Sequence, residues 1–556
     1  MGENPMILQL ISSLSKVFPD EHPRERSMTR LTALMEENIS FQAALYSTER
    51  MTLLRFRVES PLAPYISVYE VGLVPSELPV YSDHDDFVLR SEPGLYPDPL
   101  YVLEPDRLCK LPGGQWRAFW IEVDRDSKAA PGTYPIRVMA ESAQGELLAE
   151  AVLELELLPA ALPLQRLIHT EWFHCDCIAA AHHTAMFSEK HWHLMERYVR
   201  TAVKHGMNMI LTPLFTPPLD TAVGGERPTA QLVEVRKIGR RYEFGFAALL
   251  RWVQMCRAAG IQFFEFSHLF TQWGAKHAPK IVGLEDGELK LLFGWHTDAA
   301  GEEYRQFLDQ FLPELVRFIK QYGIEKYSYF HVSDEPHLEH LEAYKTAASI
   351  LDRHLAQFPR IDALSDYAFY EQGLVPCPIP ANNHLEPFLE QGVQGLWTYY
   401  CCSQYLQVSN RFFCFPSVRN RIIGIQLYKY RIEGFLHWGY NFWNAQYSVH
   451  PIDPYRITDS GLAFPSGDAF LVYPGDNGPV ESLRLKVFHE ALQDLRALEL
   501  LESYVGRERV MQLLEDGLDE PITWKHYPRE SEWLLSKREE VNAMIRRHAY
   551  GTGVNS

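Results

Sequence analysis

Two adjacent carboxylic acids are the residues in this sequence whose types and position best fit catalysis. The apolar, aromatic run YFHVS at 329–333 leads directly into Asp334, Glu335 and Pro336. A barrel strand can deliver acid and base groups to a rim in this way. Because neighbouring strand side chains point to opposite faces, the two acids share one site only if the backbone turns between or just after them. Pro336 favours such a break and is expected to hold Glu335 extended. We therefore predict an active centre here, against the alternative of a solvated loop.

The adjacency of the two acids favours one kind of chemistry. Acids on separate strands can flank the anomeric carbon of a sugar, as ordinary retaining or inverting hydrolysis requires. Neighbours in sequence cannot readily do so, which favours a nucleophile that the substrate supplies. A 2-acetamido group can attack through its carbonyl oxygen and form an oxazolinium-like intermediate. In this hypothesis Glu335 is the general acid/base, and Asp334 orients and polarises the acetamido group.

The elements that must position these acids follow residue 163, where strand-like and helical segments begin to alternate. Helical patterns cover 188–205, 246–259, 301–323, 338–357 and 417–433. This alternation is typical of parallel α/β proteins, and eight strands predict a (β/α)8 TIM barrel. The predicted strands are Arg166–Phe173, Met207–Phe215, Ile261–Phe270, Lys326–Glu335, Arg360–Phe369, Pro378–His384, Gly395–Cys402 and Gly434–Trp443.

Polar and aromatic residues gather where these strands end. Sugars stack their C–H faces on aromatic rings and exchange hydrogen bonds with polar side chains, so this gathering predicts a carbohydrate pocket. Further rim residues are Asp220, Trp172, Trp273 and Trp443. The predicted substrate-binding residues are Glu171, His268, Asp366, Asn383, Trp397, Tyr399, Trp438 and Tyr440.

The rest of the chain divides by pattern into three further parts. Residues 1–38 are predicted to form a lead-in of one or two amphipathic helices, and 39–162 a β-sandwich. The catalytic barrel is predicted over 163–505, followed by a C-terminal helical extension over 506–556. Within the sandwich, strands are expected at 53–58, 65–71, 115–123, 133–140 and 146–158.

Composition excludes several classes of partner and location. The net charge of −19 argues against nucleic-acid and anionic-membrane partners. No secretion signal or membrane span is recognised, and eight cysteines without a signal predict reduced thiols in a cytoplasmic protein. The oligomeric state stays open.

No cofactor or metal is predicted. A first cysteine and histidine group, at 169–177, and a second, at 401–414, lack the C-x-x-C or H-x-x-x-H spacing of a zinc site. Buried free thiols are the favoured interpretation of both groups. No G-x-S-x-G elbow or Gly-rich phosphate loop is present in the sequence.

Four motifs carry a family resemblance. In order they are FHVSDEPH, GFLHWGYNFWN, DAFLVYPG and SLRLKVFHEALQDL. Together they resemble the β-N-acetylgalactosaminidases of glycoside hydrolase family 123, and the Asp-Glu pair is similar to that of the substrate-assisted family 20 hexosaminidases. The resemblance covers roughly residues 165–500.

The resemblance implies retention of configuration, no metal, and a terminal β-linked N-acetylgalactosamine (GalNAc) on a small glycoside or oligosaccharide. It also implies that a tyrosine hydrogen-bonds the acetamido oxygen and that tryptophans enclose the methyl group, for which Tyr399, Trp397 and Trp438 are the candidates. A β-N-acetylglucosaminidase, another retaining glycosidase on the same barrel, and a catalytically silent sugar-binding protein remain the alternatives.

Overall fold

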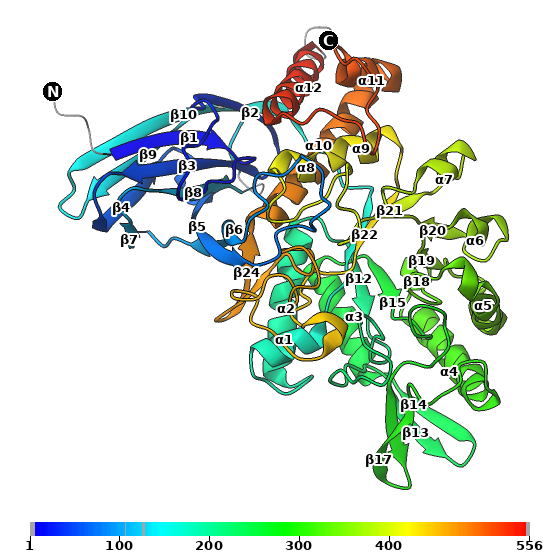
Figure 1. Cartoon of the computed structure of the whole chain (residues 1–556). Helices are drawn as coiled ribbons and strands as arrows, with labels where there is room; N and C mark the ends of the chain where they lie inside the picture. Colours follow the sequence, from blue (N-terminus) through cyan, green and yellow to red (C-terminus); the bar gives the residue numbers. More distant parts are fainter. Residues whose placement is uncertain (1–5, 106, 125–127, 552–556) are drawn as a thin grey trace.

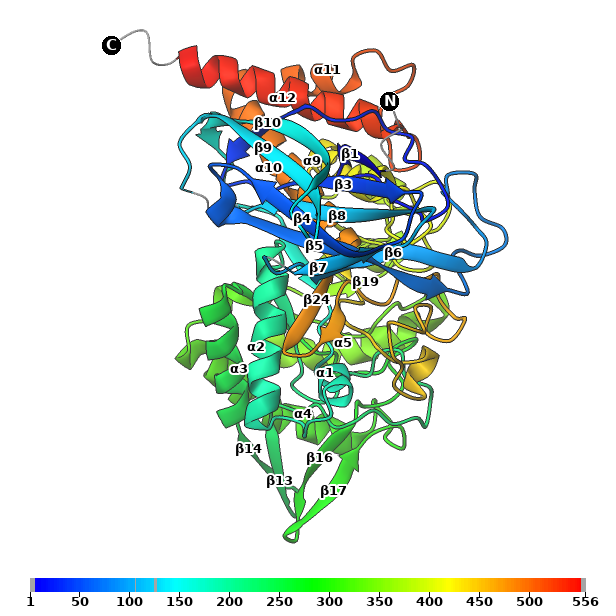
Figure 2. The same ribbon diagram turned by 90° about the vertical axis from the view of Figure 1, so that its left-hand side faces the viewer.

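The computed structural model describes residues 6–105, 107–124 and 128–551 (Figure 1). A two-layered β-sandwich lies against one side of a larger α/β part (Figures 1 and 2). The C-terminal helices α11 (Arg507–Glu515) and α12 (Ser531–Gly551) lie beside the sandwich. A small sheet projects from the α/β part at the end away from the sandwich (Figure 2).

The sandwich consists of a five-stranded and a seven-stranded sheet. The five-stranded sheet has the order β2 (Arg30–Met35), β10 (Leu147–Ala161), β9 (Gly132–Ser142), β4 (Met51–Glu59) and β7 (Leu108–Leu111). The seven-stranded sheet has the order β1 (Met6–Ser12), β3 (Ile39–Ser47), β8 (Gln115–Val123), β5 (Ile66–Ser76), β6 (Gly94–Val102), β24 (Gly478–Ser482) and β23 (Tyr473–Gly475). The five strands predicted for this region each coincide with or overlap an observed strand, and β8 has the predicted bounds.

Strand β8 explains why the seven-stranded sheet is buried on both faces. Its alternate residues Phe119 and Ile121 belong to the core between the two sheets, where Phe119 stacks on Phe56 of β4 with ring centroids 4.3 Å apart. The intervening residues Trp116 and Trp120 belong to the core shared with the α/β part. The period of two along a strand therefore connects the sandwich to the catalytic part.

The helical lead-in predicted for residues 1–38 is wrong. Strand β1 pairs antiparallel with β3, and β2 pairs parallel with β10, whose partner residues lie more than a hundred positions along the chain. Pairing with distant strands has overridden the local helical pattern. Residues 1–5 lie outside the described part of the chain.

The α/β part is built on parallel strands of three or four residues. A six-stranded sheet has the order β18 (Ser328–Phe330), β15 (Phe263–Phe266), β12 (Met209–Thr212), β11 (Ile168–Glu171), β22 (Gly434–His437) and β21 (Trp397–Tyr399). A second sheet pairs β19 (Ile361–Ala363) with β20 (Cys377–Ile379). Single parallel bridges, Phe330 to Arg360 and Ala381 to Tyr399, join the second sheet to both edges of the first. Each of the eight predicted strand ranges contains or overlaps one of these strands.

Helices pack around these strands. Ser188 caps α2 (Glu189–Lys204) by accepting a hydrogen bond from the His191 backbone N–H. Gly260, which follows the last residue of α3 (Ala247–Ala259), has a φ of +110° in the left-handed region. The helices are α1 (Cys175–Ala181), α2 (Glu189–Lys204), α3 (Ala247–Ala259), α4 (Glu302–Gln321), α5 (Leu341–Leu355), α6 (Tyr367–Glu371), α7 (Glu386–Glu390), α8 (Ser417–Arg421), α9 (Ile423–Lys429), α10 (Leu483–Val505), α11 (Arg507–Glu515) and α12 (Ser531–Gly551). Short 3-10 turns occupy Ala63–Tyr65, Glu325–Tyr327, Leu338–His340 and Gln446–Ser448.

The projecting sheet has the strand order β14 (Arg241–Gly245), β13 (Glu234–Ile238), β16 (Ile281–Glu285) and β17 (Glu288–Phe293).

Among the described residues, none of the helices is both long enough and apolar enough to cross a membrane.

Candidate active site

Both predicted acids line one cavity of about 200 Å³. Its walls are mostly aromatic or polar, as expected for a sugar site. The lining residues are Trp172, Leu219, Asp220, Gln272, Trp273, Asp334, Glu335, Ala363, Tyr399, Cys401, Cys402, Leu436, Trp438, Gln446, Tyr447 and Phe464. A larger cavity of about 790 Å³ lies between the sandwich and α12, but the described residues that line it include no aromatic side chain. Four of its charged groups form two ion pairs, Arg421 with Glu490 and Arg538 with Glu37.

A backbone turn brings the two acids to the same cavity. Strand β18 ends at Phe330, earlier than predicted, and Glu335 has φ +43°, so it is left-handed rather than extended as its neighbour Pro336 suggested. The Trp273 N–H donates to the Asp334 carbonyl at 3.1 Å, and the Glu335 N–H donates to the Ala363 carbonyl at 3.1 Å. A left-handed residue other than glycine costs about 1–2 kcal/mol, and such strain concentrates at functional sites.

Burial and mutual repulsion set the charge of the pair. Burial raises the pKa of Asp334 well above its usual range, and the neighbouring Glu335 raises it further. Burial also raises the pKa of Glu335, while a hydrogen bond from Tyr399 opposes the rise. The Tyr399 hydroxyl donates to Glu335 Oε1 at 2.9 Å. Two such carboxyl groups cannot both ionise easily, so the pair suits a division into one acid and one carboxylate.

Asp220 is a third acid in the cavity. Burial raises its pKa to about 6. Its Oδ2 accepts a hydrogen bond from the Tyr447 N–H at 2.9 Å, and its own N–H donates to Gln272 Oε1 at 2.8 Å. Asp220 was predicted as a rim residue but not as a binding residue. Tyr447 was not predicted, since it lies on a long loop whose path the strand pattern does not reveal.

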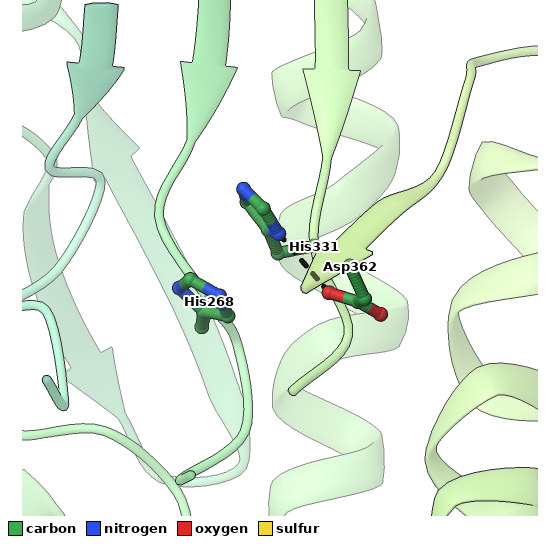
Figure 3. Close-up of side chains that lie close together, drawn as sticks. All are labelled: His268, His331 and Asp362. Carbon is green, nitrogen blue, oxygen red and sulfur yellow. Dashed lines mark hydrogen bonds and ion pairs between the residues drawn. The ribbon is translucent and has the colours of Figure 1, made fainter. Parts of the chain in front are cut away.

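A buried histidine, His331, lies close to Asp362 (Figure 3). His331 Nδ1 is 3.0 Å from Asp362 Oδ1, and its Nε2 hydrogen-bonds Glu265. Burial alone would lower the pKa of His331, but Asp362 and Glu265 raise it to about 10. Glu265 also accepts a hydrogen bond from the indole N–H of Trp172 at 2.8 Å. Through Glu265, the charged network holds Trp172 in the wall of the cavity.

His268, His331 and Asp362 are close enough to be considered as metal ligands, since their ligand atoms lie within 4.8 Å of one another. The two imidazole rings are stacked, with centroids 4.1 Å apart and planes 22° from parallel. Near-parallel rings do not direct their nitrogen lone pairs at one point, and both nitrogens of His331 already face carboxylates. The geometry fits an imidazolium bridge better than a metal centre.

The first of the two cysteine and histidine groups makes ordinary contacts. Asp176 forms an ion pair with Arg227, and Cys177 Sγ accepts hydrogen bonds from the Trp443 N–H and the Asn444 side chain. These contacts account for the first of the two groups without a shared ligand.

Two of the predicted binding residues line the cavity beside the acids. Tyr399 contacts Glu335, and Trp438 donates its indole N–H to Asp468 Oδ2 at 2.9 Å. Trp397 does not line the cavity: it lies two residues before Tyr399 on the same face, and packs where Gly434 leaves room, since a Cβ there would lie 2.0 Å from the Trp397 ring. Residues two apart on a strand share a face but lie at different depths, so Trp397 lies deeper than Tyr399.

The remaining predicted binding residues have other partners and do not line the cavity. His268 is buried against His331, the Tyr440 hydroxyl donates to the Tyr198 carbonyl, Asp366 caps α6, and Asn383 accepts a hydrogen bond from Gln404.

Glu171, also predicted to bind substrate, forms a buried bidentate pair with Arg411 at 2.8 and 2.7 Å. Burial favours its neutral form, yet the Arg411 guanidinium outweighs this and holds the pKa of Glu171 well below its usual range. The pair is therefore a permanent ion pair beside the site.

Comparisons with known proteins identify the family and a similar fold. A model of the glycoside hydrolase 123 catalytic domain matches residues 172–501. The chain is similar to the solved structure of a family 123 glycoside hydrolase from Clostridium perfringens, studied for glycolipid glycan hydrolysis, with 14% identity and a TM-score of 0.75 over 98% of this chain and 99% of that one.

Further similarities are weaker. A β-glucuronidase from Parabacteroides merdae has 11% identity and a TM-score of 0.32, over 82% of this chain and 50% of that one. No curated protein matches. Because the matching family model spans more than half of the chain, this protein belongs to glycoside hydrolase family 123 and is a glycoside hydrolase.

Proposed function

We propose that the protein is an exo-acting, retaining β-N-acetylgalactosaminidase that removes terminal β-linked GalNAc by substrate-assisted catalysis. The observation that carries this proposal is the meeting of Asp334 and Glu335 in one small cavity, with Tyr399 hydrogen-bonded to Glu335. A cavity of about 200 Å³ favours one terminal sugar over a long chain.

In the proposed mechanism the substrate decides which acid keeps the proton. The acetamido N–H of the substrate binds Asp334 and favours its carboxylate form, so that the proton stays on Glu335. Glu335 protonates the glycosidic oxygen while the acetamido carbonyl oxygen attacks C1 from the other face. Glu335 then acts as base and takes a proton from the water that opens the oxazolinium ring. Two inversions at C1 give retention of configuration.

We also propose that the eight parallel strands form a (β/α)8 barrel with the acids at its carboxyl-terminal rim. The support for this is that strand pairings and the two single bridges connect each strand to the next along the chain, and β22 to β11.

A panel of nitrophenyl glycosides tests the substrate. We expect hydrolysis of the N-acetyl-β-galactosaminide, with the N-acetyl-β-glucosaminide and the plain β-galactoside cleaved much more slowly. The Asp334→Asn variant, which should be impaired whatever the leaving group, is the control for contaminating activity. Preference for the gluco epimer would make the protein a β-N-acetylglucosaminidase, and silence across the panel together with sugar binding would make it a binding protein.

A thiazoline analogue of GalNAc and a 2-deoxy-2-fluoro galactoside test the nucleophile. We expect the thiazoline to inhibit competitively, because it resembles the bicyclic intermediate. The fluoro sugar should label no carboxylate. Stoichiometric labelling of Asp220, the third acid of the cavity, would instead assign a protein nucleophile.

A further inference from the structure

Two aromatic side chains stand at the mouth of the catalytic cavity and are more exposed than the aromatic residues deeper inside. Trp273 is 39% exposed and Tyr447 is 42% exposed, whereas Trp172 and Tyr399 are 2% and 7% exposed. All four line the same cavity. Trp172 and Tyr399 therefore suit the sugar whose glycosidic bond is cleaved. Trp273 and Tyr447 suit the part of the substrate on the other side of that bond.

The outer rings form a corner. Their centroids are 6.2 Å apart and their planes meet at 88°, so the edge of one ring abuts the face of the other. The uncovered parts of the two faces then stand at a right angle. A ring placed in this corner can stack on one face and touch the other with its edge, which are the two favourable geometries for aromatic and C–H contacts.

Both residues are held in strained backbone conformations by groups of the site itself. Trp273 has φ +55° and Tyr447 has φ +59°, each in the left-handed region. The Trp273 N–H is bonded to the Asp334 carbonyl, and the Tyr447 N–H to the Asp220 carboxylate. Ser448 Oγ also donates to the Asp220 carbonyl at 2.7 Å. Each such conformation is unfavourable by itself and persists only where several contacts enforce it.

The loop that carries Tyr447 presents further apolar surface. Its Gln446 N–H donates to the Ser460 carbonyl at 3.0 Å, which joins two loops that also carry Val449, 72% exposed, and Leu462, 59% exposed. Exposed apolar side chains on the loops of a site, with two rigid rings beside them, are typical of a surface that binds a ligand.

We propose that Trp273 and Tyr447 form the binding site for the leaving group, and that they select one whose first unit is a ring with an apolar face, such as the C–H face of a pyranose. The inference rests on the proposed function only in placing bond cleavage at Glu335. It extends that function by adding a second recognition site, and it predicts that simple methyl glycosides are poor substrates.

A pair of leaving groups with closely similar acidity tests the proposal without changing the chemical step. We would compare methyl and cyclohexylmethyl β-glycosides, and a disaccharide with a β-linked galactose as its second unit, all on the sugar that the wild type cleaves best. The wild type should favour both ring-bearing substrates. Trp273→Ala and Tyr447→Ala should each lower kcat/KM for them about 10-fold more than for the methyl glycoside.

Matched controls separate stacking from folding. Trp273→Phe keeps a ring and should retain much of the preference. Tyr327→Ala removes an equally exposed aromatic side chain, 39% exposed, just before β18 at the end away from Asp334, and should leave the ratio unchanged. Thermal unfolding of each variant checks that it is folded.

The outcomes for the two proposals are distinguishable. Equal losses on methyl and ring-bearing substrates, or no loss on either, would overturn the leaving-group site. A wild-type preference for a sugar other than GalNAc would overturn the proposed substrate, while the ratio between leaving groups would still test Trp273 and Tyr447. A preference for cyclohexylmethyl over the galactosyl unit would identify an apolar aglycone in place of a sugar.

Discussion

The Tyr399 hydroxyl donates a 2.9 Å hydrogen bond to Glu335 Oε1 and so joins the end of β21 to the turn after β18. A donor of this kind stabilises the carboxylate form and lowers the pKa of Glu335, against the effect of burial. The hydrogen bond therefore adjusts the acidity of the proposed proton donor in the free enzyme.

Tyr399→Phe should move the basic limb of the kcat/KM profile to higher pH. Without the hydroxyl, the pKa of Glu335 rises further, and the protonated acid persists into more alkaline solution. We also expect kcat to fall about 10-fold or more, because a proposed acetamido contact is lost. Full pH profiles of the two proteins provide the measurement. A basic limb that stays in place or moves to lower pH contradicts the assignment of Glu335 as the acid.

Glu335→Gln and Asp334→Asn should differ in how they depend on the leaving group. For alkyl glycosides, Glu335→Gln should lose about 10²–10⁴-fold in kcat, but much less for dinitrophenyl glycosides, which need little proton donation. Asp334→Asn should impair both classes, because ring closure by the acetamido group needs the carboxylate whatever leaves. Equal losses of Glu335→Gln across leaving groups would count against its role.

Arg411→Met should destabilise the protein strongly. It leaves Glu171 buried without its guanidinium partner, which typically costs about 3–5 kcal/mol of unfolding free energy. Urea unfolding measures the change. Arg200→Ala is the control, since its ion pair with Glu196 is exposed and is worth about 0.5 kcal/mol. The double variant Glu171→Gln with Arg411→Met should recover part of the loss, and a cost for Arg411→Met no larger than that of the control would refute the argument.

His331 should remain an imidazolium well above neutral pH. Its pKa is raised from the usual 6.5 to about 10 by Asp362 and Glu265, against the effect of burial. A raised pKa contributes stability that is complete below pH 6.5 and is lost as pH rises towards 10. Nitrogen NMR of the imidazole should show both ring nitrogens protonated at pH 8. A neutral ring at that pH would exclude the bridge between the two carboxylates.

Local pattern predicted the strands but not their partners. The run QWRAFWIEV was recognised as a strand because six of its nine residues are apolar or aromatic, and it became β8 with the predicted bounds. The segments that became β1 and β2 have short apolar runs compatible with a helix, and only pairing with β3 and β10 makes them strands. Such distant pairing leaves no signal in the local sequence.

The same limit applies to the site. Asp334 and Glu335 were recognisable because an apolar run, a pair of acids and a proline stand together. Trp397 was predicted to line the pocket because it lies near the end of a strand. It lies deeper than the pocket because it comes two residues before Tyr399 and packs in the space that Gly434 leaves open. Tyr447 was missed, because its place depends on a hydrogen bond to Asp220 more than two hundred positions earlier.

The antiparallel pairing of β24 with β6 means that the sandwich is completed by chain that has already passed through the catalytic part. Lys486 of α10 is likewise paired with Glu122 of β8, both buried. A truncated protein limited to the residues matched by the family model would lose the strand beside β24 and leave Lys486 without that carboxylate. The sandwich and the catalytic part therefore form one folding unit that should be expressed and engineered whole.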